Sequence, residues 1–328
     1  MSNPRVAIGI LAYARVNDLA LTLCSVAALT TPSVTTILLQ SGMSDAEFEQ
    51  VVKSHPWVTA VSNQTNLGAA GGRNRLIDLA LGGDYDYLFF LDSDALPAPD
   101  ALDKLLSIYP TLERPALVGC IVRVLERPQE IHSSGVSFDY FSLRDIHHTD
   151  LPAAAAVECQ AIITTAVLVA CQVLDQLPRL DERIFAYWED LDWCLRIGAV
   201  GWKHYVVRDA IAYHALWRPR FHPAVIYYKT RNHLLVASKL GKPWHYPVVR
   251  HLMWETMIHH LHRIRVLTPL GLNCFIAVLI AYWHVIIGRW GIAPAWMRRA
   301  DEQFLEFRLR HFFLQPHWVA MIKRIVGH

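Results

Sequence analysis

Two aspartates separated by one serine are the residues of this chain best suited to chemistry. Asp92 and Asp94 follow directly after the run Tyr87–Leu91, in which every side chain is apolar or aromatic. Such a run predicts a strand buried on both faces. Open α/β sheets bind their ligands beyond the carboxyl ends of strands of this kind. Two carboxylates at that point suit a hard divalent cation and the phosphates that the cation carries.

A simpler interpretation is that these aspartates only start a turn and cap the next helix. Asp100 already fits the capping role, because it precedes an apolar helical pattern with Asp103 in its first turn. Asp92 and Asp94 lie well upstream of that point and are left for another role. We therefore keep the metal interpretation beside the structural one.

A glycine-rich stretch, Asn66–Asn74, follows a predicted strand and opens a predicted helix. Glycines let the backbone approach a ligand closely, and a helix N-terminus favours an anion. The spacing matches neither the dinucleotide-binding pattern GxGxxG nor the phosphate loop GxxxxGK[ST]. The stretch thus favours phosphate binding but disfavours a dehydrogenase or a P-loop enzyme.

Acidic residues cluster among apolar and aromatic neighbours in a third stretch, Phe185–Arg196. A carboxylate among aromatic rings loses hydration, which raises its pKa and makes it a better general base. Asp192 and Arg196 are spaced i, i+4 and predict an ion pair on a helix. Glu189 and Asp190 are then open for chemistry, although acidic residues at a helix start also interact well with the helix dipole.

A fourth feature is His214, which ends a short apolar run. A single histidine is usually only a polar residue. Beside a pair of aspartates it becomes a plausible third metal ligand.

Apolar periodicity indicates which elements position these residues. Strands and helices alternate through the first hundred residues, which predicts an α/β fold with a mostly parallel sheet covered on both faces. The predicted strands are 6–11, 35–39, 58–62 and 87–91, and the predicted helices are 18–29, 45–54 and 71–81. Further strands are expected at 117–125 and 162–170, and further helices at 185–199 and 225–240.

The chain has 328 residues and changes character near residue 240. We expect one domain over 1–240 and a helical, membrane-associated region over 241–328, with a helix at Val248–Arg265. Residues 266–287 contain no Asp, Glu, Lys or Arg, which is long enough for a membrane span. Pro269, Asn273 and His284 weaken that reading, so we favour helices lying in the cytosolic face of the membrane over a full span, with a buried helix as the alternative. Several arginines near this segment suit anionic headgroups or a pyrophosphate: Arg263, Arg265, Arg289, Arg298 and Arg299.

The net charge of only +2 argues against a nucleic-acid partner held by the field of the whole protein.

The order of these motifs resembles that of the family 2 glycosyltransferases, which have the GT-A fold. The branch that it resembles most contains bacterial rhamnosyltransferases and galactofuranosyltransferases. The resemblance spans residues 5–240 and is carried by Asn66–Asn74, Asp92–Asp94, Trp188–Asp192 and His214.

The resemblance implies a role for each matching residue. Asp190 would be the catalytic base, with Glu189 helping to place the acceptor. Asp94 and His214 would bind Mg²⁺ or Mn²⁺ at the donor diphosphate, and Asp92 would contact the ribose or a water on the metal. The donor nucleotide would lie against Ala12, Tyr13, Arg15, Asn66, Gly68, Arg73 and Ser93.

One position departs from the family pattern. An aspartate that reads the pyrimidine base usually follows the second strand, whereas this chain has Gln40 there. The amide of Gln40 both donates and accepts, so it can still hydrogen-bond to a base edge. The usual base specificity is thereby placed in doubt.

The resemblance therefore predicts an inverting, metal-dependent glycosyltransferase at the cytoplasmic face of the cell membrane. Our first expectation is transfer of L-rhamnose from dTDP-rhamnose to a polyprenol-linked saccharide in bacterial surface polysaccharide synthesis, with oligomerisation left open. The rivals are UDP-galactofuranose or a UDP-hexose as donor, and a catalytically silent GT-A module in an assembly. Asp94, Asp190 and His214 are all present, which argues against the silent module.

Overall fold

The computed structural model describes residues 3–13, 16–63, 65–141, 143–215, 222–241 and 269–298. These residues fall into two compact units, which we treat separately. The first contains the described residues up to 181 and 190–215, and the second contains 182–189, 222–241 and 269–298. Arg15, the predicted helix Val248–Arg265 and the rest of 242–268 and 299–328 lie outside the described residues.

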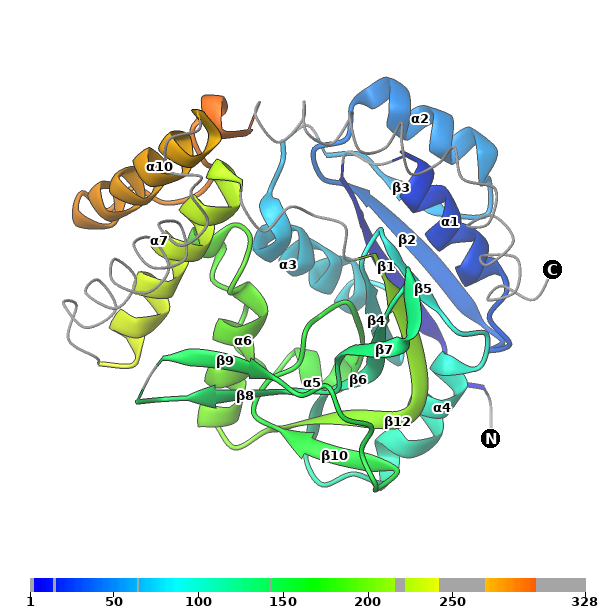
Figure 1. The fold of residues 1–328 in the computed structure, drawn as a ribbon. Coiled ribbons are helices and arrows are strands. Elements are labelled where there is room, and N and C mark those ends of the chain that lie inside the picture. Colours follow the sequence, from blue (N-terminus) through cyan, green and yellow to red (C-terminus); the bar gives the residue numbers. More distant parts are fainter. Residues whose placement is uncertain are drawn as a thin grey trace. The chain divides into compact units, whose positions relative to one another are not determined.

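The first unit is built on a ten-stranded sheet with the strand order β10-β12-β6-β11-β4-β1-β2-β3, to which β5 and β7 add at β12 and β6 (Figure 1). Its first four strands are parallel to one another. They are β1 (Val6–Ala12), β2 (Val34–Gln40), β3 (Thr59–Val61) and β4 (Tyr87–Leu91). Each was predicted from its apolar run, and the α/β prediction is confirmed for this half.

Three helices connect these strands: α1 (Val16–Ala27), α2 (Asp45–Ser54) and α3 (Gly68–Leu81). Right-handed crossovers place α1 and α2 on one face, because the chain moves outward from β1 to β3. The chain then returns across β1 to β4, so α3 covers the opposite face (Figure 1). Both faces of the parallel strands are thereby covered, as predicted.

The second half of the unit is mixed. The long strands β6 (Pro115–Val124) and β12 (Lys203–His214) pair in parallel, while β11 (Ala166–Ala170) lies antiparallel between β4 and β6. The strands that complete the unit are β5 (Ala95–Pro97), β7 (Arg127–Ser133), β8 (Val136–Asp139), β9 (Arg144–His147) and β10 (Ala156–Cys159). Of these, β8 and β9 form a separate hairpin. The sequence did not reveal these five, because most are too short to show a clear period. The remaining helical segments are α4 (Ala101–Ile108), η1 (Tyr109–Thr111), α5 (Cys171–Leu174) and α6 (Glu189–Ala199).

The core of this unit surrounds β4. Its residues 88–91 are at most 3% exposed, which confirms a strand buried on both faces. Phe90 meets the fully buried Trp193 edge to face, with 6.0 Å between ring centroids. The indole Nε1 of Trp193 donates to the carbonyl of Pro178 at 2.6 Å, so this large side chain is buried with its polar atom satisfied. α6 is thereby fixed against the central strand.

The prediction that Asp100 caps α4 is correct in position but wrong about the side-chain hydrogen bond. Asp100 occupies the N-cap position, but its side chain makes no capping hydrogen bond. Its carboxylate instead forms an ion pair with Lys104 at 2.7 Å, one turn further along the helix. Asp103 accepts hydrogen bonds from the hydroxyls of Thr30 and Thr31, so it ties the helix start to the loop before β2.

The second unit contains η2 (Glu182–Ile184), α7 (Pro223–Lys239) and α10 (Pro269–Ile286), and α7 packs against α10. α7 belongs here, although the predicted boundary at residue 240 assigns it to the first domain; that boundary stays a prediction. Among the described helices, none combines the length and the apolar character that a membrane crossing requires.

The helix predicted from residue 185 begins only at Glu189. Phe185, Tyr187 and Trp188 instead have φ values of 63°, 63° and 74°, in the left-handed region. The carbonyls of this stretch accept hydrogen bonds from side chains of α7, which takes the place of the helical pattern. The helix prediction is therefore wrong for 185–188 and confirmed from Glu189.

Candidate active site

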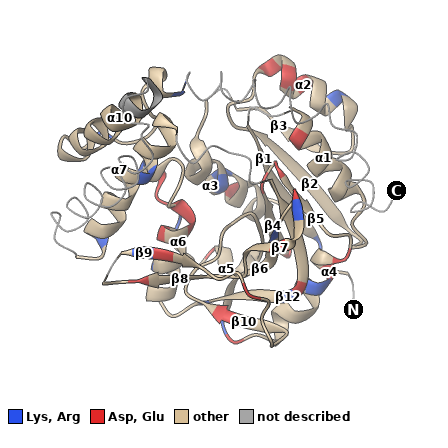
Figure 2. Cartoon of the chain, viewed as in Figure 1, with Lys and Arg blue, Asp and Glu red and all other residues tan. Residues whose placement is uncertain are grey.

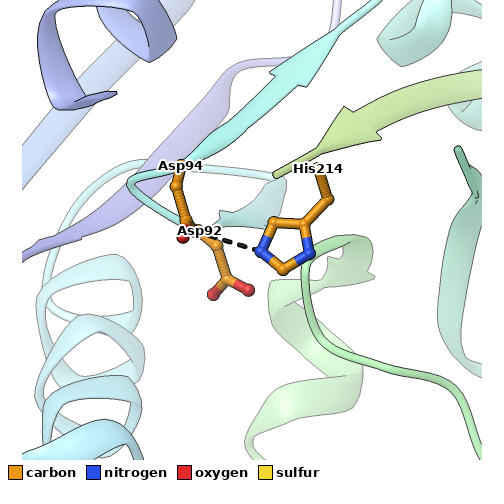
Figure 3. Close-up of side chains that lie close together, drawn as sticks. All are labelled: Asp92, Asp94 and His214. Atoms are coloured by element: carbon orange, nitrogen blue, oxygen red, sulfur yellow. Dashed lines mark hydrogen bonds and ion pairs between the residues drawn. The ribbon is translucent and has the colours of Figure 1, made fainter. Parts of the chain in front are cut away.

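A strand pairing far apart in sequence brings the metal candidates together. β5 pairs antiparallel with the end of β12, and Ala95 lies opposite His214 in that register. Asp94 therefore lies beside His214, and its Oδ1 is 3.2 Å from the histidine Nε2. Figure 3 shows both side chains with Asp92, which comes from the same turn after β4.

The three residues suit a divalent cation. One ligand atom from each of Asp92, Asp94 and His214 lies within 4.8 Å of the others. Asp94 is only 6% exposed, and a buried carboxylate needs a partner of opposite charge or a hydrogen-bond donor. Two carboxylates and one imidazole are ligands that Mn²⁺ accepts, and carboxylates suit Mg²⁺. The residues present thus fit the cation that the sequence predicted.

An arginine from α3 reaches one of these carboxylates. The guanidinium Nη2 of Arg73 is 2.9 Å from Oδ1 of Asp92, and Arg73 itself is 6% exposed. α3 lies close to β1 because Gly72 has no side chain: a Cβ there would lie 2.8 Å from Leu11 Cδ1. The glycine that the sequence associated with ligand approach therefore serves helix-to-strand packing, and this packing places Arg73.

The ends of β1 and β2 and the start of α3 meet at one point. A Cβ on Gly42 would lie 2.6 Å from Asn66 Nδ2 and 2.9 Å from Tyr13 Cδ2, and Gly42 has φ 102°. Asn66 Oδ1 accepts a hydrogen bond from the amide of Gly68 at 2.8 Å. The predicted donor-binding residues Tyr13, Asn66 and Gly68 thus lie together at this edge of the sheet.

The other predicted donor residues have different surroundings. Ala12 is fully buried at the end of β1, whereas Tyr13 beside it is 45% exposed. Ser93 lies between the two aspartates, and its carbonyl accepts a hydrogen bond from the hydroxyl of Thr22 at 3.0 Å. This bond ties the metal-candidate turn to α1.

Both polar atoms of the Gln40 side chain form hydrogen bonds within the protein. Its Nε2 donates to the carbonyl of Met43 at 3.0 Å and to Asp45 Oδ1 at 2.7 Å. Its Oε1 accepts from the hydroxyl of Ser62 at 2.7 Å and from the amide of Asn63 at 3.3 Å. With 3% exposure, Gln40 holds the β2 and β3 ends together in this conformation, and its predicted contact with a base stays a prediction.

Asp190 lies at the start of α6 and has the electrostatics of a general base. Burial raises the pKa of Asp190, while the positive charge of Arg73 and then the bond from the Leu191 amide lower it. That amide donates to Asp190 Oδ1 at 2.8 Å. A raised carboxyl pKa makes a stronger base at neutral pH. Because Arg73 acts on Asp190 and also pairs with Asp92, the base and metal candidates belong to one neighbourhood.

The sequence missed polar residues from the β7 and hairpin strands. His132 of β7 stacks on His147 of β9, with ring centroids 5.7 Å apart, and lies 6.3 Å from the ring of His214. His147 Nε2 is 3.3 Å from Asp145 Oδ2. The charges of His147 and Asp145 both affect the pKa of Asp190. Only the abundance of histidine hinted at these residues, since their strands had no clear pattern.

The other acidic residues of α6, Asp192 and Glu189, have different surroundings. Asp192 is 2% exposed and accepts from Arg196 Nε at 2.8 Å, which confirms the predicted i, i+4 ion pair. Glu189 belongs to the second unit and is 7% exposed. Its role in placing the acceptor stays a prediction.

The chain is similar in sequence to known glycosyltransferases. The chain is 28% identical over 192 residues to the amylovoran biosynthesis glycosyltransferase AmsB of Erwinia amylovora, covering 56% of this chain and 60% of that protein. It is 23% identical over 223 residues to the galactofuranosyltransferase GlfT2 of Mycobacterium tuberculosis, covering 58% of this chain and 35% of that protein. The chain thus spans less than two thirds of the length of these relatives.

Solved structures show the same fold at low identity. GalNAc-T7 with UDP, GalNAc and Mn²⁺ matches with a TM-score of 0.59 and 14% identity, over 72% of this chain and 48% of that one. The mannosyltransferase PcManGT from Pyrobaculum calidifontis, in complex with GDP-Man and Mn²⁺, matches with a TM-score of 0.52 and 14% identity, over 99% and 85%. The predicted GT-A fold is confirmed.

A family model described as glycosyltransferase like family 2 matches residues 4–233, a range that contains every metal and base candidate above. With that match over more than half of the chain, and with the resemblance read from the motifs confirmed, this protein belongs to the family 2 glycosyltransferases.

Proposed function

We propose that this protein is an inverting, metal-dependent glycosyltransferase that moves a sugar from a nucleotide-diphosphate donor to a hydroxyl of a lipid-linked saccharide. The observation that carries the proposal is the convergence of Asp92, Asp94 and His214 within 4.8 Å, from two strands that are distant in sequence. Relatives and structural neighbours support it, because their names describe glycosyltransferases and two of the solved neighbours hold Mn²⁺.

Asp190 is the group that activates the acceptor. A sugar hydroxyl is a weak nucleophile, so its proton must leave as its oxygen attacks the anomeric carbon. Burial raises the pKa of Asp190 and thereby strengthens its carboxylate as the proton acceptor. The new bond forms on one face of the sugar while the bond to the nucleotide diphosphate breaks on the other, so a single displacement inverts the anomeric centre.

Asp92, Asp94 and His214 would hold Mg²⁺ or Mn²⁺ against the diphosphate. When bound, the cation supplies charge neutralisation for the leaving group. Arg73 adds a fixed positive charge beside Asp92, at 2.9 Å from its Oδ1. The N-terminus of α3 also favours a phosphate: Asn66 Oδ1 accepts from its first amide, that of Gly68, and Leu67 adds no side-chain capping bond.

The donor sugar has two candidates. The sequence resemblance favours L-rhamnose from dTDP-rhamnose, and the GlfT2 relatives favour galactofuranose from its UDP donor. The two differ in nucleotide as well as sugar, so nucleotide binding separates dTDP-rhamnose from UDP donors, and a sugar panel must then separate galactofuranose from a UDP-hexose. Because Gln40 is engaged within the protein, we expect other groups at the β1 and β2 ends to read the base.

The acceptor and the location belong together in this proposal. α10 has no Asp, Glu, Lys or Arg, and it is drawn without charge colours in Figure 2. One face of it packs in the second unit through Cys274, Ala277 and Ala281, while large apolar side chains on another face are exposed. These are Phe275 (41%), Leu279 (48%), Trp283 (58%) and Ile286 (76%). We propose that this face lies in the surface of the cytoplasmic membrane leaflet, where a polyprenol-linked acceptor is presented.

Sedimentation with phosphatidylethanolamine and phosphatidylglycerol vesicles tests the membrane part. Replacing Trp283 by Glu removes an apolar anchor worth about 1.5–3 kcal/mol, so we expect vesicle affinity to fall about ten- to hundredfold. Val200→Glu is the matched control, because Val200 is also 58% exposed but lies in the first unit. Equal binding by both variants would refute membrane contact through α10.

A thermal-shift panel tests the transferase site itself. It compares dTDP, UDP and GDP, each with Mn²⁺, Mg²⁺ or EDTA. A nucleotide at about 100 times its dissociation constant stabilises by about 2.7 kcal/mol. We expect one nucleotide to stabilise the protein only when metal is present, and Asp94→Asn to abolish that response.

The matched control for Asp94 is Asp78→Asn, which removes an exposed carboxylate paired with Arg179 and should keep the response. No metal-dependent response to any nucleotide would refute the proposed site and favour a catalytically silent module.

A further inference from the structure

A short stretch just before the proposed base is held in an unusual backbone conformation. We call Arg183–Trp188 the clamped segment. Three of its residues, Phe185, Tyr187 and Trp188, have φ between 63° and 74°. Side chains with a Cβ rarely adopt this region, and such strain persists only where the surroundings impose it. The segment continues directly into Glu189 and Asp190.

Asn232 of α7 supplies part of that constraint. Its Nδ2 lies 2.8, 2.7 and 2.8 Å from the carbonyls of Ile184, Ala186 and Tyr187, so these three acceptors share its two N–H groups. Asn232 is fully buried, so these bonds are protected from water. A single amide thus fixes three carbonyls within four residues, and this replaces the hydrogen bonds that a helix would have made there.

The neighbouring Arg231 holds the same segment from its other end. Its guanidinium donates to the carbonyls of Arg183 and Ile184 at 3.1 and 3.0 Å, and to the carbonyl of Gly291 at 2.6 Å. Its Nε donates to Asn232 Oδ1 at 3.0 Å, which also fixes the orientation of that amide. Arg231 is fully buried, and every one of these acceptors is neutral.

The guanidinium of Arg231 packs against aromatic rings. The guanidinium carbon of Arg231 lies 5.1 Å from the ring centre of Tyr227 and 5.3 Å from that of Tyr228. Tyr228 in turn stacks on Phe185 of the clamped segment, with 5.5 Å between centroids. A buried, carbonyl-bound arginine is a costly device. Two of the carbonyls that accept from Arg231 belong to the clamped segment, which indicates that this arginine holds the segment in place.

We propose that Arg231 and Asn232 are positioning residues that hold the clamped segment so that Asp190 is presented in its reactive place. The inference rests on the proposed role of Asp190 as base. It does not make either residue a contact of donor or acceptor. They act through the backbone that leads into α6, where a displacement of about 1 Å can lower turnover about 100-fold.

Hydrogen–deuterium exchange, nucleotide affinity and turnover test the proposal together on the full chain. We expect Asn232→Ala to raise exchange of the amides of 184–191 by at least about tenfold, because three carbonyl bonds are lost. Turnover of dTDP-rhamnose or UDP-galactofuranose, whichever is the substrate, should fall about 100-fold. Metal-dependent affinity for the matching nucleotide, dTDP or UDP, should stay unchanged, which separates positioning from general unfolding.

Tyr228→Phe is the matched control. It keeps the ring beside Arg231 and Phe185 but removes the hydroxyl that accepts from the Ala293 amide, so it loses a buried bond elsewhere in the same unit. We expect it to keep wild-type turnover. A control that loses as much turnover as Asn232→Ala would overturn the proposal, and so would unchanged exchange or turnover in Asn232→Ala.

Two further variants complete the test. Arg231→Lys keeps the charge but has no planar fork, and we expect a smaller rise in exchange than for Arg231→Met. Asp190→Asn separates the two proposals: if it retains turnover, the base assignment is wrong, whereas unchanged exchange in Asn232→Ala shows that the clamp itself is wrong.

Discussion

Asn74 in α3 gives the sharpest test of how the first unit is held together. Its Nδ2 donates to the carbonyl of Leu180, and its Oδ1 accepts from the Leu180 amide, both at 3.0 Å. Asn74 is 8% exposed and Leu180 is 3% exposed. Asn74→Ala leaves a buried amide and a buried carbonyl unsatisfied, each costing about 1–3 kcal/mol, so we expect a loss of about 2–6 kcal/mol. That is a large part of the stability of an ordinary domain.

Urea unfolding followed by tryptophan fluorescence and far-ultraviolet circular dichroism measures this loss. Asn63→Ala is the control, because the Asn63 side chain donates one exposed hydrogen bond, to the carbonyl of Thr65 at 2.6 Å. We expect this control to cost less than about 1 kcal/mol. Equal losses in the two variants, or a loss under about 1 kcal/mol for Asn74→Ala, would refute the reasoning that burial sets the cost.

Three other predictions follow from packing and charge. Burial lowers the pKa of His204 to about 4, from an ordinary pKa of 6.5, so folding stability is lost as pH falls from 6.5 toward 4. In a pH series of melts, we expect the wild type to lose about 3 kcal/mol more stability over this range than His204→Gln. Gly72→Ala pushes a methyl against Leu11 and should cost about 1–3 kcal/mol by urea unfolding, whereas Gly198→Ala in α6 meets open space and should not destabilise. Burial raises the pKa of Asp190, so its ionisation opposes folding as pH rises; Asp190→Asn should abolish transfer yet melt higher than wild type at pH 8, and a difference that persists well below the ordinary carboxyl pKa would contradict this sign.

Local patterns in the sequence predicted the first half of the fold correctly. Apolar runs of strand length and amphipathic helices alternate there, and a parallel α/β sheet is the arrangement that covers both faces of such strands. The place of Asp92 and Asp94 at the end of β4 followed from the same pattern. The ion pair of Asp192 with Arg196 was equally predictable, because i, i+4 spacing puts both on one helix face.

Long-range contacts decided what the patterns left open. Asp94 and His214 are 120 residues apart and meet only because β5 pairs with β12. β5 has too few residues to show a strand pattern in the sequence. Nothing in the sequence indicated that four partners from two other segments would engage the amide of Gln40. These are bonds between distant residues, and their partners leave no periodic trace in the chain.

The segment before α6 shows the physical reason most directly. By composition Phe185–Trp188 reads as the first turn of a helix, and the local preference for that structure is weak. Arg231 and Asn232 offer its carbonyls several buried hydrogen bonds, which outweigh the preference and select a left-handed backbone. The sequence by itself indicated the candidate residues for the chemistry and the parallel strands that lie beneath them. Tertiary hydrogen bonds, which depend on groups far along the chain, decided how those residues are presented.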